Sequence, residues 1–141
     1  MSEKLSEYTF DEIEIGLTKQ FDVNNTESTI DDFARTSGDY NPLHMDEKAA
    51  QARNFTNRVC HGMFLASLFS RLVGMYIPGK YGLYFSQTLN FVNPGIVNDT
   101  ITVIGKVISK SESTRIIKLR TTIKNAAHNL VEGEAKVVLS K

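Results

Sequence analysis

The segment from His61 to Ile77, HGMFLASLFSRLVGMYI, is apolar on nearly every side and contains one charged residue, Arg71. A helix with apolar residues all round must be covered by the rest of the protein. The longest uncharged stretch here, Val59 to Ser70, is shorter than the roughly twenty residues that span a bilayer. The segment therefore predicts a helix buried inside a soluble protein, with other elements wrapped around it.

The chain after this segment alternates apolar and polar residues in four stretches. Period-two alternation predicts strands with one buried face. The apolar residues are Leu83, Phe85, Leu89 and Phe91; Ile101, Val103 and Val107; Ile117, Leu119 and Ile123; and Val131, Ala135, Val137 and Leu139. Turns are expected at 93–95, 98–99, 110–114 and 125–129. An antiparallel sheet curled around one long central helix, the arrangement called the hot-dog fold, satisfies both patterns.

The residues before the buried segment predict helices. Between 25 and 37 apolar residues recur at helical spacing, Thr26 or Ser28 can cap the start, and Gly38 can end the helix. Residues 46–53 form a second, alanine-rich candidate. Helices followed by strands favour an α+β architecture. We expect one hot-dog domain over residues 1–141.

Charge and cysteine content narrow the classes of partner. Sixteen basic and sixteen acidic residues give a formal net charge of zero, which disfavours nucleic acid and acidic membrane as partners. Cys60 is the only cysteine, so an internal disulfide and a multi-cysteine metal site are excluded. The beginning, MSEKLSEYTFDEIEIG, lacks the basic start and apolar core of a signal peptide. These features predict a cytoplasmic protein.

The segment from Ser37 to His44, SGDYNPLH, places an acid, an amide and an imidazole on one short loop. Gly38 can adopt a positive φ after the helix, and Pro42 fixes its own φ and restricts the residue before it. Such a loop holds its side chains still. Asp39 and His44 could then share one water molecule, which is the geometry that a hydration reaction needs.

A second candidate element is Cys60-His61-Gly62-Met63, at the expected start of the buried helix. A helix N-terminus offers free N–H groups and a partial positive charge. Gly62 lets a ligand approach those groups closely. A thioester oxygen that gains negative charge would be stabilised there, as in an oxyanion hole.

Together, SGDYNPLH and the later HGMFLASLFS resemble the MaoC-like R-specific enoyl-CoA hydratases. The likeness continues through PGK at 78–80, GLY at 82–84, SQTLNF at 86–91 and EGEA at 132–135, and so covers about residues 16–139. Two features depart from the pattern. These are Cys60 directly before the His-Gly pair, and the polar segment 52–58.

The resemblance implies reversible hydration of a trans-2-enoyl-CoA to an R-3-hydroxyacyl-CoA. It assigns the catalytic dyad to Asp39 and His44 and the thioester oxygen to the N–H of Gly62. It also implies a homodimer whose sheets join edge to edge, with active sites near the interface. An acyl-CoA thioester is thus the expected substrate, and no metal, nicotinamide or flavin is expected.

Five further residues are predicted to bind substrate, and each has a structural alternative. They are Asn41, His61, Leu65, Ser70 and Val73. Asn41 can instead close an Asx turn, and His61 can cap the helix or bridge to the loop. Ser70 can bond its own backbone, while Leu65 and Val73 can simply belong to the core.

Several other functions fit the same motifs. One is dehydration of 3-hydroxyacyl groups on acyl carrier protein, and another is a hot-dog thioesterase. A third is a non-catalytic dimer that binds acyl thioesters. A metal site formed by Asp39, His44 and His61 has no further ligand cluster to support it, so none is predicted. Cys60 is expected to be a buried small residue rather than a nucleophile.

Overall fold

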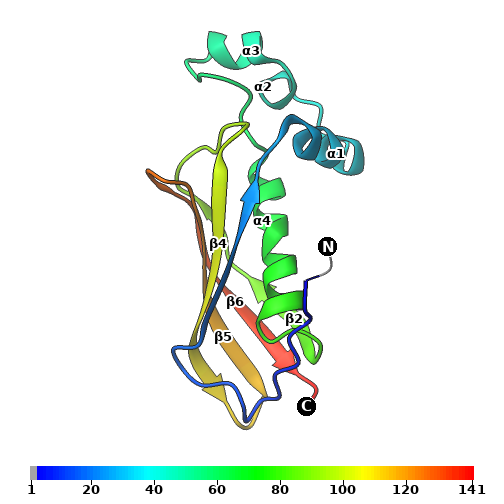
Figure 1. The fold of residues 1–141 in the computed structure, drawn as a ribbon, viewed down its shortest axis with the longest axis vertical. Coiled ribbons are helices and arrows are strands. Elements are labelled where there is room, and N and C mark those ends of the chain that lie inside the picture. Colours follow the sequence, from blue (N-terminus) through cyan, green and yellow to red (C-terminus); the bar gives the residue numbers. More distant parts are fainter. Residues whose placement is uncertain (1–2) are drawn as a thin grey trace.

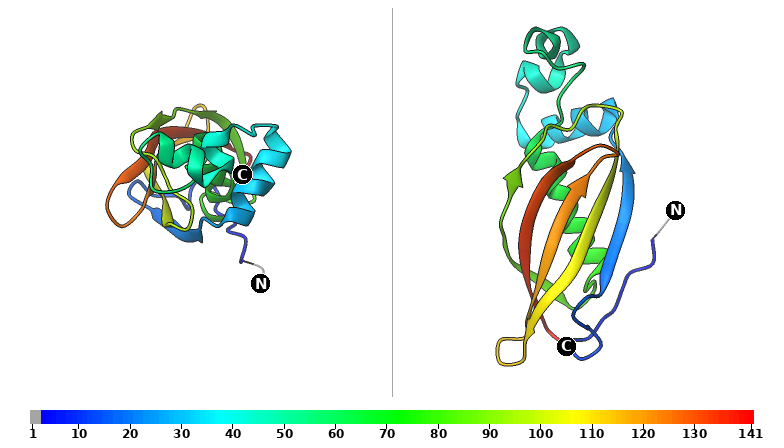
Figure 2. Two further views of the ribbon diagram at one scale, coloured as in Figure 1. Left: turned by 90° about the horizontal axis from the view of Figure 1, so that it is seen from above. Right: turned by 90° about the vertical axis from the view of Figure 1, so that its left-hand side faces the viewer.

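The computed structural model describes residues 3–141 and contains a six-stranded antiparallel sheet curled around a central helix (Figures 1 and 2). The helices are α1 (Glu27–Ser37), α2 (Pro42–Met45), α3 (Glu47–Ala52), α4 (Gly62–Arg71) and the π-helix η1 (Leu72–Tyr76). The strands are β1 (Thr18–Asn24), β2 (Gly82–Gln87), β3 (Asn90–Phe91), β4 (Thr100–Ser111), β5 (Ile116–Lys124) and β6 (Asn129–Leu139). The order across the sheet is β1-β4-β5-β6-β2, and β3 also pairs with β6. The predicted α+β architecture is confirmed.

The central helix α4 lies along the inner face of the sheet (Figure 2). Its buried residues Phe64, Leu65 and Phe69 join the inward side chains of β4, β5 and β6 in one core. The helix continues without a break into η1, so the buried segment predicted over 61–77 is one helical rod with a π-type last turn. Gly105 of β4 allows close packing, because a Cβ there would lie 2.8 Å from Leu72 Cδ2.

The predicted inward faces of β4, β5 and β6 are confirmed, but that of β2 and β3 is wrong. Leu83 and Phe85 on β2 are 71% and 64% exposed, and Phe91 on β3 is 52% exposed. The alternation identifies the strand but not the side that its apolar face takes. Here β2 is an edge strand, and its inward side is occupied by Tyr84, which packs against the core.

Strand β1 is absent from the sequence-based prediction. It pairs with β4 along seven positions, yet only Phe21 among its side chains is buried. An edge strand of composition TKQFDVN has too few apolar residues for its alternation to stand out.

The three helices α1, α2 and α3 form a helical cap, residues 27–52, beyond one end of the sheet (Figure 1). Thr26 caps α1 by accepting a hydrogen bond from Thr29, and Gly38 ends it with a φ of 81°. Asp46 caps α3 in the same way, by accepting from Lys48. Both predicted helices are therefore confirmed, and α2 is an additional turn between them. Within residues 3–141, no helix is both long enough and apolar enough to cross a membrane.

Candidate active site

The loop between α1 and α2 is held by a series of short-range hydrogen bonds. Asp39 Oδ1 accepts from the N–H of Asn41 at 3.1 Å, and Asn41 Oδ1 accepts from the N–H of Leu43 at 3.0 Å. Asn41 is the N-cap of α2, and Pro42 occupies the first turn, where its missing N–H costs nothing. The rigid loop expected from Gly38 and Pro42 is present, and Asn41 has the capping role that was its structural alternative.

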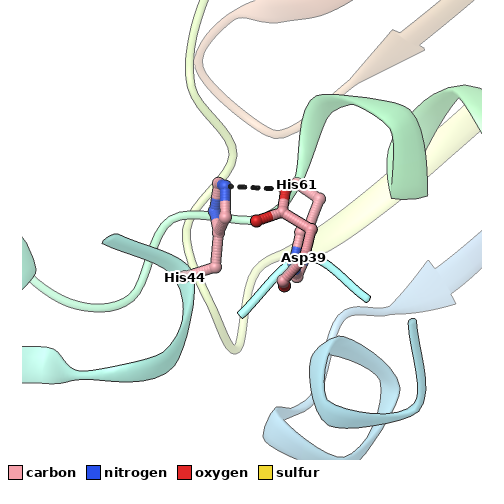
Figure 3. A group of neighbouring side chains, drawn as sticks. All are labelled: Asp39, His44 and His61. Carbon is pink, nitrogen blue, oxygen red and sulfur yellow. Dashed lines mark hydrogen bonds and ion pairs between the residues drawn. The ribbon is translucent and has the colours of Figure 1, made fainter. Parts of the chain in front are cut away.

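The His44 side chain is oriented by a backbone carbonyl. Its Nδ1 lies 2.7 Å from the carbonyl oxygen of Val59. Because a carbonyl oxygen accepts, Nδ1 carries the proton, and in the neutral ring Nε2 has a free lone pair. That atom faces Asp39 Oδ2 at 3.8 Å, the contact drawn as a dashed line in Figure 3.

The separation between His44 Nε2 and Asp39 Oδ2 is too long for a direct hydrogen bond. In the neutral imidazole both atoms are acceptors, so neither satisfies the other. A polar contact of this length calls for a bridging molecule that donates to both sides. Asp39 is 48% exposed and His44 15%, so the pair is open to solvent on the acid's side. The geometry suits one water molecule that donates both its hydrogens.

The His61 side chain is 2% exposed and contacts both members of this pair. Its Nε2–H donates to the backbone carbonyl of Asp39 at 2.9 Å, and its ring stacks on that of His44 at 4.0 Å between centroids. Burial lowers the pKa of His61, so the ring is neutral. Within residues 3–141 its Nδ1 has no hydrogen-bond partner. His61 therefore bridges to the loop, which was one of its two structural alternatives, and it provides no side-chain cap for α4.

The N-terminus of α4 opens beside the same pair. Its first N–H groups, beginning with Gly62, have no carbonyl one turn earlier to bond to, and no side chain caps them. A Cβ on Gly62 would lie 2.9 Å from two ring atoms of Phe91. Glycine thus permits the close approach of β3 to the helix start, and it leaves a positively polarised set of donors.

These groups line one pocket of about 620 Å³. The structure brings four predicted residues together on its wall: Asp39, His44, His61 and Gly62. Its other lining residues are mainly apolar and include Phe33, Val59, Met63, Phe91, Val92 and Pro94. Sequence alone did not assign Phe33 and Phe91 to the site, because an aromatic residue at core spacing has the same pattern whether it packs or lines a pocket.

The remaining predicted substrate-binding residues lie elsewhere. Leu65 and Val73 are 2% and 3% exposed and belong to the core, and neither lines this pocket. Ser70 is exposed on α4 and does not line it either. Leu65 and Val73 therefore occupy the core positions that were their structural alternatives, and the role of Ser70 stays a prediction.

Cys60 lies in the pocket wall but is buried, at 3% exposure. The side-chain amide of the buried Asn25 donates to its sulfur. Burial raises the pKa of the Cys60 thiol to about 11, so almost none of it is thiolate near neutral pH. These features fit the expected small buried residue and disfavour a nucleophile.

Asp39, His44 and His61 each offer one potential metal-ligand atom, and these atoms lie within 4.8 Å of one another. Each ring already donates one N–H to a backbone carbonyl. Among residues 3–141 no fourth His, Cys, Asp or Glu belongs to the group. The absence of a resident metal stays a prediction.

Comparison with known proteins identifies the family. A family model described as "MaoC like domain" matches residues 10–129. An (R)-specific enoyl-CoA hydratase of Aeromonas caviae is 43% identical over 108 residues, which are 76% of this chain and 81% of that protein. A 3-hydroxybutyryl-CoA dehydratase of Methylorubrum extorquens is 33% identical over 94% of this chain and 84% of that protein.

The solved structure of an unliganded R-hydratase from Pseudomonas aeruginosa superimposes with a TM-score of 0.91 at 29% identity. The superposition covers 96% of this chain and 87% of the Pseudomonas aeruginosa protein. The expected hot-dog fold is thereby confirmed. A family model matches most of the sequence, and these two relatives cover 94% and 76% of it, so the chain belongs to the MaoC-like family.

Proposed function

We propose that this protein is an R-specific enoyl-CoA hydratase, which adds water reversibly to a trans-2-enoyl-CoA to form an R-3-hydroxyacyl-CoA. The observation that carries the proposal is the placement of Asp39 and His44 Nε2, 3.8 Å apart, beside the uncapped start of α4 in an apolar pocket. The names of the two relatives, a hydratase and a dehydratase of acyl-CoA thioesters, support it.

In this mechanism a water molecule donates one hydrogen to Asp39 and one to His44 Nε2. Asp39 takes its proton as the water oxygen bonds to C3 of the enoyl group. The π electrons of the C2–C3 bond move toward the thioester carbonyl and form an enolate. Asp39 returns its proton to the new hydroxyl oxygen as that hydroxyl passes its own hydrogen to His44 Nε2. His44 then gives this proton to C2 of the enolate, so both side chains return to their starting states. The tautomer set by the Val59 carbonyl keeps Nε2 available for this transfer.

The enolate oxygen gains negative charge during the reaction, and the N–H groups at the start of α4 are placed to stabilise it. Gly62 supplies the first of these donors. Preorganised donors of this kind act most strongly on charge that develops in the transition state, and removing one typically costs roughly a hundredfold to a thousandfold in rate. The apolar wall around Phe33, Phe91 and Val92 receives the acyl chain.

The working form proposed here is a homodimer of single hot-dog domains, residues 1–141, in the cytoplasm. Four exposed apolar side chains support a partner on the β2 side: Leu83, Phe85, Phe91 and Val92. Within residues 3–141, the outer edge of β2 pairs with no strand. Phe91 and Val92 also line the pocket, so a second subunit there would lie next to the site.

Purified protein incubated with crotonyl-CoA tests the function. We expect loss of the enoyl ultraviolet band, R-3-hydroxybutyryl-CoA on chiral analysis, and no release of free thiol. Butyryl-CoA serves as the thioesterase substrate, and crotonyl-acyl carrier protein tests the other carrier. Thiol release from butyryl-CoA, or binding of crotonyl-CoA with an unchanged enoyl band, would overturn the proposal.

A further inference from the structure

The two proposed catalytic side chains come from different elements and make no direct hydrogen bond. Asp39 follows the end of α1, whereas His44 lies in α2. None of the four residues of α2 is buried, so packing alone fixes this short helix weakly. In addition to the hydrogen bonds of the loop itself, contacts that join α1 to α2 therefore help to set the distance between the Asp39 carboxylate and His44.

Arg58 makes those contacts from the polar segment that departs from the family pattern. Its side chain is 9% exposed. Nε–H donates to the backbone carbonyl of His44 at 2.6 Å, and Nη2 donates to Asp31 Oδ1 in α1 at 2.5 Å. A second acid of α1, Glu27, lies 4.0 Å from Nη1. One guanidinium thus bonds to both elements that present the pair.

The next residue completes the attachment of His44. The N–H of Val59 donates to the carbonyl of Leu43 at 3.2 Å, and the carbonyl of Val59 receives His44 Nδ1–H. Residues 58 and 59 together hold the backbone and the ring of His44. Arg58 itself does not line the pocket, so it acts through His44 and not on the substrate.

We propose that Arg58 is a positioning residue that ties α1 to α2 and so sets the separation of Asp39 and His44. Of the tests of this inference, only the kinetic measurement depends on the proposed function. The planar fork of arginine is essential, since a lysine ammonium reaches one partner and has no donor at the place of Nε. A misplacement of about 1 Å costs roughly a hundredfold in rate when two groups must meet one water.

Two neighbouring acids of α1 supply a matched pair of variants. Asp31 binds the buried Arg58, whereas Asp32 pairs with Arg35 at the surface, where both side chains are more than half exposed. Asp31→Ala and Asp32→Ala change the same helix by the same substitution. We expect Asp31→Ala to lower kcat by roughly tenfold with a smaller change in KM. Asp32→Ala should stay within about twofold of the wild type.

Arg58→Lys and Arg58→Met separate charge from positioning. Lysine keeps a cation near Asp31 but loses the Nε donor to His44, so both variants are expected to lose roughly tenfold to a hundredfold in kcat. If charge near the site were what matters, Arg58→Lys would retain wild-type kcat, which would overturn the proposal.

A readout that needs no activity is the NMR signal of the His44 ring Cε1–Hε1 group, which is assignable because the chain has three histidines. We expect one sharp signal in the wild type and in Asp32→Ala, and a broadened or doubled signal in Asp31→Ala. This result supports the positioning role even if hydration of crotonyl-CoA fails. Asp31 is partly exposed and its variant should fold, so it decides the question if an Arg58 variant unfolds. An Asp31→Ala variant that matches Asp32→Ala in both kcat and line shape would refute the proposal.

Discussion

Asp39 and His44 owe their proposed chemistry to their surroundings. Asp39 is half exposed and His44 is fixed through its other ring nitrogen. Because Nδ1–H donates to the Val59 carbonyl, Nε2 of the neutral ring is a hydrogen-bond acceptor. The Asp39 carboxylate is an acceptor too, so a molecule that donates to both must lie between them. The backbone of a third segment thus selects the tautomer of the neutral ring that hydration needs.

The pair can be tested by conservative substitution. Asp39→Asn removes the base but keeps the hydrogen bond that closes the loop, and His44→Gln removes the titrating group. Each should lower kcat on crotonyl-CoA by roughly a hundredfold to ten-thousandfold. The double variant should lose far less than the product of both, because the two residues act on one water. Melting curves confirm that each variant is folded, and near wild-type turnover by folded Asp39→Asn would end the assignment.

Cys60 gives the protein a measurable dependence of stability on alkaline pH. Its pKa in the folded state is raised by burial to about 11 from 9.0. Between these values the unfolded chain releases the thiol proton and the folded chain keeps it, so the free energy of unfolding falls as pH rises. Below about pH 9 the protonated thiol makes its full contribution to the free energy of unfolding. By about pH 10.5 roughly 2 kcal/mol of that contribution is lost.

Urea unfolding of the wild type and Cys60→Ala at about pH 8 and about pH 10.5 isolates this effect, since all other titrating groups are common to both. The stability difference between the two proteins should shrink by about 2 kcal/mol at the higher pH. A difference that is the same at both pH values would show that the thiol titrates normally in the folded protein.

At the scale of residues, the features that could be predicted from the sequence are the helix ends and the rigid loop, which depend on local backbone chemistry. Thr26, Gly38 and Pro42 act within a few positions of themselves, and each has the predicted role. From the sequence, Arg58 is only one member of the unusually polar segment 52–58. Its partners lie 14 and 27 positions away, and no local pattern specifies such contacts.

At the scale of elements, the start of α4 and strand β3 are fitted to each other through Gly62. Alanine suits the first turn of a helix, but its Cβ would press on the Phe91 ring at 2.9 Å. Phe91 is half exposed and can rotate away. The displaced ring would then crowd the pocket that it lines.

Gly62→Ala should therefore fold normally and keep the N–H donor, while KM for enoyl-CoA rises by roughly tenfold. Adding Phe91→Ala to this variant should bring KM back toward that of the Phe91→Ala single variant. Steady-state kinetics of the three proteins measure this. A large fall in kcat without a change in KM would mean instead that the substitution moves the oxyanion donors.

Strands were predicted where apolar alternation is long, as in β4, β5 and β6. The same rule located β2 but gave Leu83 and Phe85 the wrong side. Period-two alternation contains no information on which face of the strand meets the core. That ambiguity is resolved only by tertiary packing.

At the scale of the whole molecule, the exposed face of β2 makes assembly testable. Phe85→Lys places a charge in the proposed interface and should yield a monomer in sedimentation velocity at micromolar concentration. Ile15→Lys is the matched control, because Ile15 is equally exposed at 65% but lies outside the β2 face. A monomeric wild type with full activity, or a Phe85→Lys dimer as stable as the wild type, would contradict the proposed homodimer.

The helical cap contributes few residues to the core, since α1 buries Ile30 and Ala34, α2 buries none and α3 buries only Ala50. Free energies of local opening follow such differences in burial, so the cap should open before the sheet and α4 unfold. Enzymatic inactivation would then precede global denaturation. In a urea titration, we expect activity and hydrogen-exchange protection of residues 39–52 to be lost while the circular dichroism of the sheet is unchanged. Coincident loss of activity, protection and circular dichroism would show that the cap and the core unfold as one cooperative unit. The Asp39–His44 pair would then resist urea as well as the core does.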